Sequence, residues 1–263
     1  MNPLLATILA CLAGGVLAIL AAAGTLALRP SRIARLVSFA VGALLGAVFL
    51  ELLPHALEHG SVDSVMITVL CGLLAFFLLE KLVLWRHSHG EQASDAHASD
   101  KAGAHAHHVP VHEGGRSGLM ILIGNSVHNI CDGIVIAASF LSSPALGVAT
   151  TLAIVAHAIP QQVGDFAVLL VSGFSRSKAF AYNIATGLAT LAGGLAGYFF
   201  LAQMQELLPT VLALAAASLL YVSVADLIPA LHRHPQPVET AKQLVLMGLG
   251  IAIIAGVHVL LER

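Results

Sequence analysis

Two groups of polar residues interrupt strongly apolar stretches of the chain. They are His128, Asn129 and Asp132 in the first stretch, and His157, Gln161, Gln162 and Asp165 in the second. An ionisable group in the middle of a membrane-crossing segment costs roughly 2.5–3.5 kcal/mol on insertion scales, so such groups usually serve a function. Imidazole, carboxylate and amide groups together suit a divalent metal ion. The two groups therefore indicate a metal site inside a membrane.

Helical spacing brings the members of each group onto one face. An α-helix turns about 100° per residue, so residues four apart lie almost above one another. His128 and Asp132 have this separation, with Asn129 beside them, and so do His157 and Gln161. Two neighbouring antiparallel helices would then present facing halves of one site.

Further polar groups in apolar stretches are expected to mark the path of the ion. They are Glu51, His55, Asp165 and Asp226. The sequence Glu-Leu-Leu-Pro at 51–54 is echoed by Asp-Leu-Ile-Pro at 226–229. Proline-interrupted helices at corresponding positions of inverted repeats are a pointer to a transport site. His258 stands alone on its predicted helix and is expected to be structural.

The composition places these residues in a membrane protein. Of the 263 residues, 58% are hydrophobic and 10% are charged, and the mean hydropathy is +0.90. A soluble domain carries about 25% charged residues. The net charge of −2 says little about partners. The three cysteines lie in apolar blocks without paired spacing and are expected to be buried free thiols.

The apolar blocks are long enough to predict eight transmembrane helices. Their approximate ranges are 3–28, 32–57, 63–86, 117–140, 145–172, 177–201, 207–231 and 238–261. Eleven of the twelve Lys and Arg residues lie on or beside the links after the first, third, fifth and seventh helices. By the positive-inside rule those links are cytoplasmic and both termini face outward. We expect an all-α polytopic membrane protein with an inverted repeat of three, two and three helices.

The one long link, 87–116, divides the chain into helices within 1–86, a cytoplasmic His-rich flexible loop, and helices within 117–263. It is polar, has no apolar periodicity, and holds seven of the fourteen histidines. Such a composition favours disorder, and His-rich tracts bind metal ions. A loosely constrained linker without metal binding is the alternative.

These motifs resemble those of the ZIP (Zrt/Irt-like) family of divalent metal transporters over nearly the whole chain. The resemblance rests on His-Asn-x-x-Asp-Gly at 128–133, His-x-Ile-Pro-x-x-x-Gly-Asp-Phe at 157–166, both proline motifs, the His-rich link and the eight helices. It implies a primary ion between the 117–140 and 145–172 helices, held by His128, Asp132 and His157. A neighbouring position would be shaped by Asn129, Gln161, Gln162 and Asn183.

The resemblance also implies a secondary transporter that moves the ion toward the cytoplasm by an elevator-like movement. Zinc is the first expected cargo, with iron, manganese and cadmium after it, and neither a cofactor nor enzymatic activity is expected. The expected partners are metal ions and the lipid bilayer, with a homodimer left open and no nucleic acid. The expected location is the plasma (inner) membrane, and an intracellular compartment is the alternative.

Three positions depart from the family pattern, and one of them lies near Asn125, where an Asp that members frequently have is absent. Ala158 stands where members commonly have a Glu that bridges two ions, and Gln161 stands where His is frequent. One well-held ion is therefore expected, with the second position weak or vacant.

Two other functions remain open at this point. One is a metal-responsive membrane sensor without flux, with residues 87–116 as the receiver. The other, less favoured, is an intramembrane metalloenzyme, because the motif at 157 lacks the general-base Glu of His-Glu-x-x-His.

Overall fold

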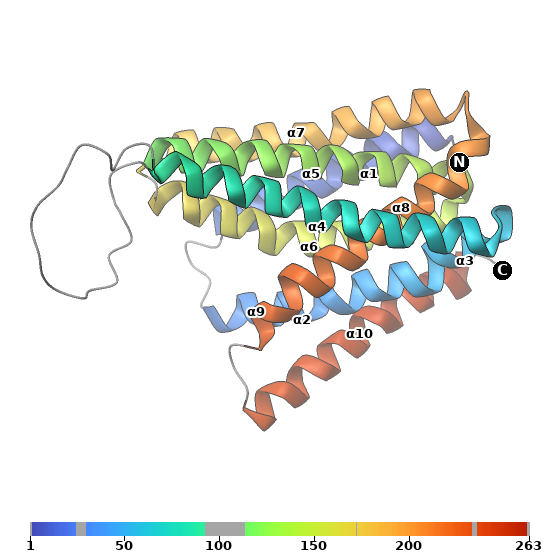
Figure 1. Ribbon diagram of the computed structural model, residues 1–263. Helices are drawn as coiled ribbons and strands as arrows, with labels where there is room; N and C mark the ends of the chain where they lie inside the picture. Colours follow the sequence, from blue (N-terminus) through green and yellow to red (C-terminus); the bar gives the residue numbers. More distant parts are fainter. Residues whose placement is uncertain (1, 25–29, 93–113, 172, 233–235, 262–263) are drawn as a thin grey trace, which may run out of the picture.

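The computed structural model describes residues 2–24, 30–92, 114–171, 173–232 and 236–261. These residues form long helices that run side by side (Figure 1), and no strand occurs among them. The elements are α1 (Pro3–Gly24), α2 (Pro30–Gly46), η2 (Ala47–Leu52), α3 (Leu53–His59), α4 (Val62–Gln92), α5 (Gly114–Ser142), α6 (Pro144–Val171), α7 (Arg176–Leu201), η4 (Gln205–Leu207), α8 (Leu208–Tyr221), η5 (Val222–Leu227), α9 (Ile228–Leu231) and α10 (Pro237–Leu261).

These elements correspond to the eight predicted spans. The second span is built from α2, η2 and α3, and the seventh from η4, α8, η5 and α9. Seven described stretches are long and apolar enough to cross a bilayer. The remaining long helix, α5, has 29 residues and carries the first polar group. The all-α polytopic membrane fold is thus confirmed.

The first and last helices have their outer ends on the same side of the bundle, as an even number of membrane crossings requires. α1 begins and α10 ends at one end of the bundle, whereas α4 ends and α5 begins at the other (Figure 1). Which end faces the cytoplasm stays a prediction. α4 runs to Gln92 and α5 begins at Gly114, so both ends of the predicted 87–116 loop are helical. The remaining loop histidines, His97, His105, His107, His108 and His112, lie outside the described residues.

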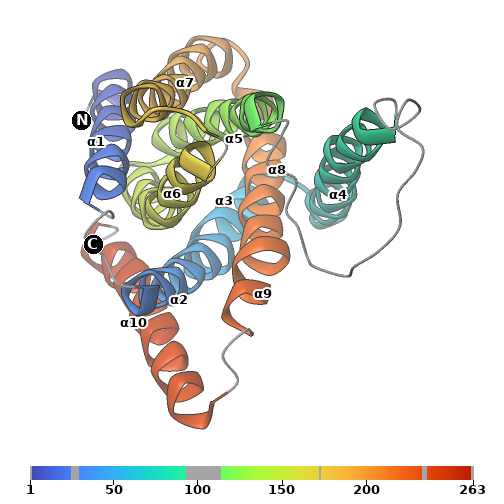
Figure 2. The same cartoon turned by 90° about the vertical axis from the view of Figure 1, so that its left-hand side faces the viewer.

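Seen end-on, the helices fall into two groups (Figure 2). In one group α1, α5, α6 and α7 pack around one another, and in the other α2 packs against α10 while α8 packs against α4. The groups meet where α2 and η2 pack against α6. Buried apolar side chains fill that junction, among them Leu44, Leu52, Leu146 and Ile154.

The outer faces of α4 and α10 remain apolar and exposed. Leu74 on α4 is 60% exposed and Leu260 on α10 is 78% exposed. An isolated chain in water would be penalised for this apolar area, whereas in a bilayer these side chains contact lipid. The exposed leucines therefore agree with membrane insertion.

The closest helix contact in the first group depends on glycine. A Cβ on Gly133 of α5 would collide with the backbone of α7 at Thr190 and Gly194, and a Cβ on Gly193 of α7 would collide with Ile130 of α5. Small residues let membrane helices approach closely and gain van der Waals contact. This contact holds α5 firmly, and Asp132 is the residue next to Gly133.

The second and seventh spans share an unusual backbone feature. In each, a six-residue π-helical segment ends two residues before a proline, Pro54 or Pro229. The residue before each proline donates its N–H to the carbonyl five residues earlier, from Leu53 to Val48 and from Ile228 to Ser223. Such wide turns occur mostly inside α-helices and often at functional sites. The repeated Pro motif is therefore accompanied by a repeated backbone conformation in the same register.

Candidate metal centre

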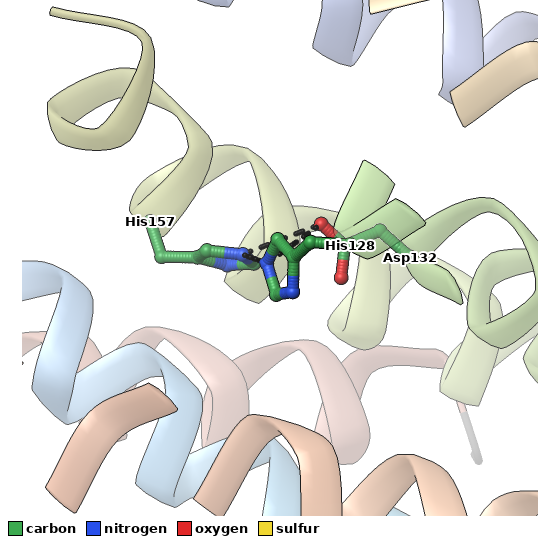
Figure 3. A group of neighbouring side chains, drawn as sticks. All are labelled: His128, Asp132 and His157. Carbon is green, nitrogen blue, oxygen red and sulfur yellow. Dashed lines mark hydrogen bonds and ion pairs between the residues drawn. The ribbon is translucent and has the colours of Figure 1, made fainter. Parts of the chain in front are cut away.

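Three side chains from α5 and α6 point toward one another (Figure 3). The Nε2 atoms of His128 and His157 are 3.3 Å apart. Oδ2 of Asp132 lies 3.5 Å from Nε2 of His128 and 3.4 Å from Nε2 of His157. Among the described residues, this is the group of His, Cys, Asp and Glu side chains whose atoms lie close enough to share a metal ion.

The three distances match those between the ligands of one zinc ion. Zinc ligands sit about 2.0–2.1 Å from the metal at tetrahedral corners, which places them about 3.3–3.4 Å from one another. The same contacts are long for hydrogen bonds, which cluster near 2.9 Å for N–H···O. The geometry therefore suits a shared cation better than direct hydrogen bonds between the side chains.

A backbone carbonyl of the same helix faces the imidazole of His157. Nδ1 of His157 lies 3.3 Å from the carbonyl oxygen of Ala153, one turn earlier on α6. A carbonyl only accepts, so the tautomer that suits this contact has the proton on Nδ1 and keeps the lone pair of Nε2 for a ligand. Metal-binding histidines commonly have such a backbone partner on the second nitrogen.

Burial makes an ion at this position favourable. Asp132 and His157 are each 1% exposed, and Oδ1 of Asp132 has no hydrogen-bond partner among the described residues. A buried charge without compensation is costly. A bound cation would supply that compensation, which makes the donor set chemically consistent with a metal.

A cavity of about 20 Å³ adjoins Asp132, the size needed for one water molecule or ion. Asn129, Ala158 and Gln162 also line it. Nδ2 of Asn129 and Oε1 of Gln162 are buried there without a hydrogen-bond partner among the described residues. The cavity therefore lies where the sequence predicts a neighbouring ion position, and Ala158 contributes no ligand to it.

The two other predicted ligands differ in their placement. Asn183 on α7 is fully buried, and its Nδ2 donates to the backbone carbonyl of Gln162 at 3.2 Å. Thr186, which sequence reasoning did not single out, accepts from Nε2 of Gln162 at 3.1 Å. These two bonds tie α7 to α6 beside the site. Gln161 is half-buried and is not among the residues that line the cavity.

The predicted path residues lie on both helix groups. Glu51, on η2, is fully buried, and His55 has Nδ1 2.9 Å from the Glu51 carbonyl and Nε2 3.4 Å from Oγ of Ser143. Asp165 is 9% exposed and accepts a hydrogen bond from Asn125. The side chain of Asp226 lies outside the described part of the structure.

His258, which the sequence predicts to be structural, has a partner on another helix. Its Nδ1 lies 3.2 Å from Oε1 of Glu51, so α10 contributes a partner to a buried carboxylate on η2. The contact depends on the packing of α10 against the second span, and no local sequence pattern reports it.

Comparison with known families decides what kind of protein carries this site. A family model described as ZIP Zinc transporter matches residues 3–258. The chain belongs to the ZIP zinc transporter family. As a ZIP protein it is a multi-pass integral membrane transporter of metal ions, with zinc the supported cargo, and it is not an enzyme.

Individual relatives agree with this assignment. Zinc transporter ZIP13 of Homo sapiens is 33% identical over 261 residues, covering 85% of this ZIP chain and 70% of the human protein. The ZIP13 homolog of Drosophila melanogaster is 31% identical over 280 residues, covering 87% and 78%. Zinc transporter ZIP4 of Homo sapiens is 33% identical over 253 residues, but the match covers 39% of that longer protein.

Proposed function

We propose that this protein carries zinc across its membrane toward the cytoplasm through the site formed by His128, Asp132 and His157. The observation that carries the proposal is the set of mutual distances, 3.3, 3.4 and 3.5 Å, which matches three corners of a zinc tetrahedron. The fourth corner remains for water, so the ion can enter and leave by ligand exchange.

The ligand set suits transport because it holds the ion moderately. Two neutral imidazoles and one carboxylate leave a dication with a net charge of +1 at the centre. That incomplete neutralisation weakens the electrostatic hold relative to a site with several carboxylates. Iron, manganese and cadmium are further proposed cargoes, since imidazole and carboxylate ligands accept them as well.

The two helix groups supply the moving and fixed parts of this proposal. The site lies wholly within the group of α1, α5, α6 and α7, while Glu51 and His55 belong to the other group. Movement of the first group past the second would expose the ion to each side in turn. We propose that both termini lie outside, that the loop within 87–116 lies inside, and that the protein resides in the plasma membrane.

Zinc uptake into proteoliposomes tests the proposal. The variant His157→Ala removes one of the three corners and is expected to abolish uptake. The variant His232→Ala, which alters an exposed histidine after α9, serves as the matched control and should retain it. Unchanged uptake by His157→Ala would place the ligands elsewhere.

A further inference from the structure

The wall of the cavity beside Asp132 includes a thiol from a fourth helix. Cys11 of α1 is 1% exposed and lines the cavity together with Asn129, Asp132 and Gln162. The thiol is directed toward α7, because a Cβ on Gly194 would lie 2.7 Å from Sγ of Cys11. Sequence spacing gives no hint of this proximity, since α1 ends at Gly24 and α5 begins only at Gly114.

Two residues that line the cavity have buried acceptor oxygens without partners. Oδ1 of Asp132 and Oε1 of Gln162 make no hydrogen bond among the described residues, and the two side chains are 1% and 4% exposed. Buried polar atoms are nearly always satisfied in proteins, so two such oxygens on residues of one cavity call for a ligand. The cavity of about 20 Å³ has room for a single ion or water molecule.

Asp132 borders both the pair of histidines and the cavity. Oδ2 faces the imidazoles of His128 and His157. Oδ1 has no hydrogen-bond partner among the described residues, and Asp132 also borders the cavity. One carboxylate can therefore contact an ion between the histidines and a second ion in the cavity.

We propose that Cys11 supplies a thiolate ligand to a second cation position in this cavity, alongside Asp132 and the amide oxygen of Gln162. On binding, the S–H bond breaks, a sulfur–metal bond forms, and the proton leaves to the medium. This inference rests on the proposed function, because it shares Asp132 with the primary ion.

The chemistry of sulfur decides which ions this position takes. Thiolates favour soft and borderline ions such as Cd²⁺ and Zn²⁺, whereas Mn²⁺ prefers oxygen ligands. Ala158 leaves the neighbouring wall without a carboxylate, so sulfur is the one anionic donor that the described lining adds to Asp132. The second position is therefore selective for thiophilic ions.

The chain offers two matched controls for a test by substitution. Cys131 on α5 is half-buried and Cys71 on α4 is exposed, so the expectation that all three thiols are buried is wrong for these two. Neither lines the cavity. A variant with both Cys71→Ala and Cys131→Ala keeps Cys11 as its sole thiol.

The experiment titrates the purified full-length protein with Cd²⁺ and records the ultraviolet sulfur-to-cadmium charge-transfer band. The native protein and the double variant Cys71→Ala/Cys131→Ala are expected to develop the band. In Cys11→Ser the charge-transfer band is expected to be absent. The more weakly bound of the two cadmium ions is expected to bind on the order of ten to a hundred times less tightly than in the native protein, the range found even for changes outside the direct ligands. A charge-transfer band requires sulfur on the metal, so a thiol that only packs against Gly194 gives none.

The outcomes separate this inference from the proposed function. A band that survives in Cys11→Ser, or no band in a native protein that carries zinc, overturns the assignment of Cys11 alone. A native protein that neither carries zinc nor binds cadmium overturns both. Circular dichroism of Cys11→Ser with retained cadmium binding at the histidines shows that the variant is folded.

Discussion

Asp132 is the residue on which the site depends most, because it provides the single carboxylate that faces both imidazoles. Replacing either histidine removes one neutral donor, whereas replacing Asp132 removes the negative charge as well. The carboxylate is 1% exposed, so water cannot substitute for a missing cation without cost. Affinity, stability and transport are therefore linked through one side chain.

Ala158 sets the charge of the neighbouring position. Ala158→Glu adds a carboxylate to the cavity that Asp132 lines and is expected to raise metal occupancy or to shift selectivity toward oxygen-preferring ions. Equilibrium binding of Zn²⁺ and Mn²⁺ to the purified variant measures both effects.

The control for this substitution is Ala158→Gln, which has nearly the same volume without the charge. The cavity is small, about 20 Å³, so both side chains must displace their neighbours. Equal binding by the Glu and Gln variants would mean that added bulk, rather than charge, governs the position.

At the scale of elements, the placement of α5 against α7 fixes the site. Asp132 and Gly133 are consecutive, and Gly133 packs directly on the α7 backbone. A change in this contact therefore displaces a carboxylate that must meet two imidazoles within a few tenths of an ångström.

Gly133→Ala is expected to lower both stability and zinc uptake. The added Cβ would collide with backbone atoms that cannot rotate away, and overpacking of this kind costs about 1–3 kcal/mol. The apparent melting temperature in detergent and the uptake rate are the measurements.

Gly248→Ala on α10 is the matched control, because a Cβ there meets no atom within 4 Å. Alanine in a helix interior is favoured over glycine by about 0.5–1 kcal/mol, so this variant should melt at the same temperature or higher. A lower melting temperature for Gly248→Ala than for Gly133→Ala would refute the role given to the α5–α7 contact.

The sequence predicted those features that depend on local spacing. His128 and Asp132 are one turn apart, and His157 lies on the next helix along the chain, so helical geometry and a short link already bring them together. Cys11, Thr186 and the Glu51–His258 pair escaped prediction because each depends on which distant helices pack together. Residues at i and i+4 report on one face of one helix, and they carry no information about a partner from α1, α7 or α10.

At the scale of the whole molecule, the proposed transport site and the His-rich link belong to different segments of the sequence. The site is formed by α5 and α6, whereas the histidines between residues 93 and 113 lie outside the described ranges. A transporter needs the site on α5 and α6, whereas a sensor that uses the link as its receiver needs the histidines of the link.

Replacing the seven histidines of 87–116 by serine keeps the length of the link and removes its imidazoles. Zinc uptake into proteoliposomes is expected to remain at most of the native rate, because the ligands on α5 and α6 are untouched. His157→Ala measured in parallel gives the level expected when the site itself is lost. Loss of uptake to that level in the serine variant would make the link part of the transport route.

The paired wide turns before Pro54 and Pro229 also bear on the history of the chain. A π turn holds one residue more than an α turn between bonded groups, so it is the form a helix takes when it absorbs a single-residue insertion. Both spans carry it in the same register relative to proline and to an acidic residue. If the two halves descend from one duplicated unit, the insertion came before the duplication. In a homologue whose π turn is missing from one half, the acidic residue of that half should then be free to vary.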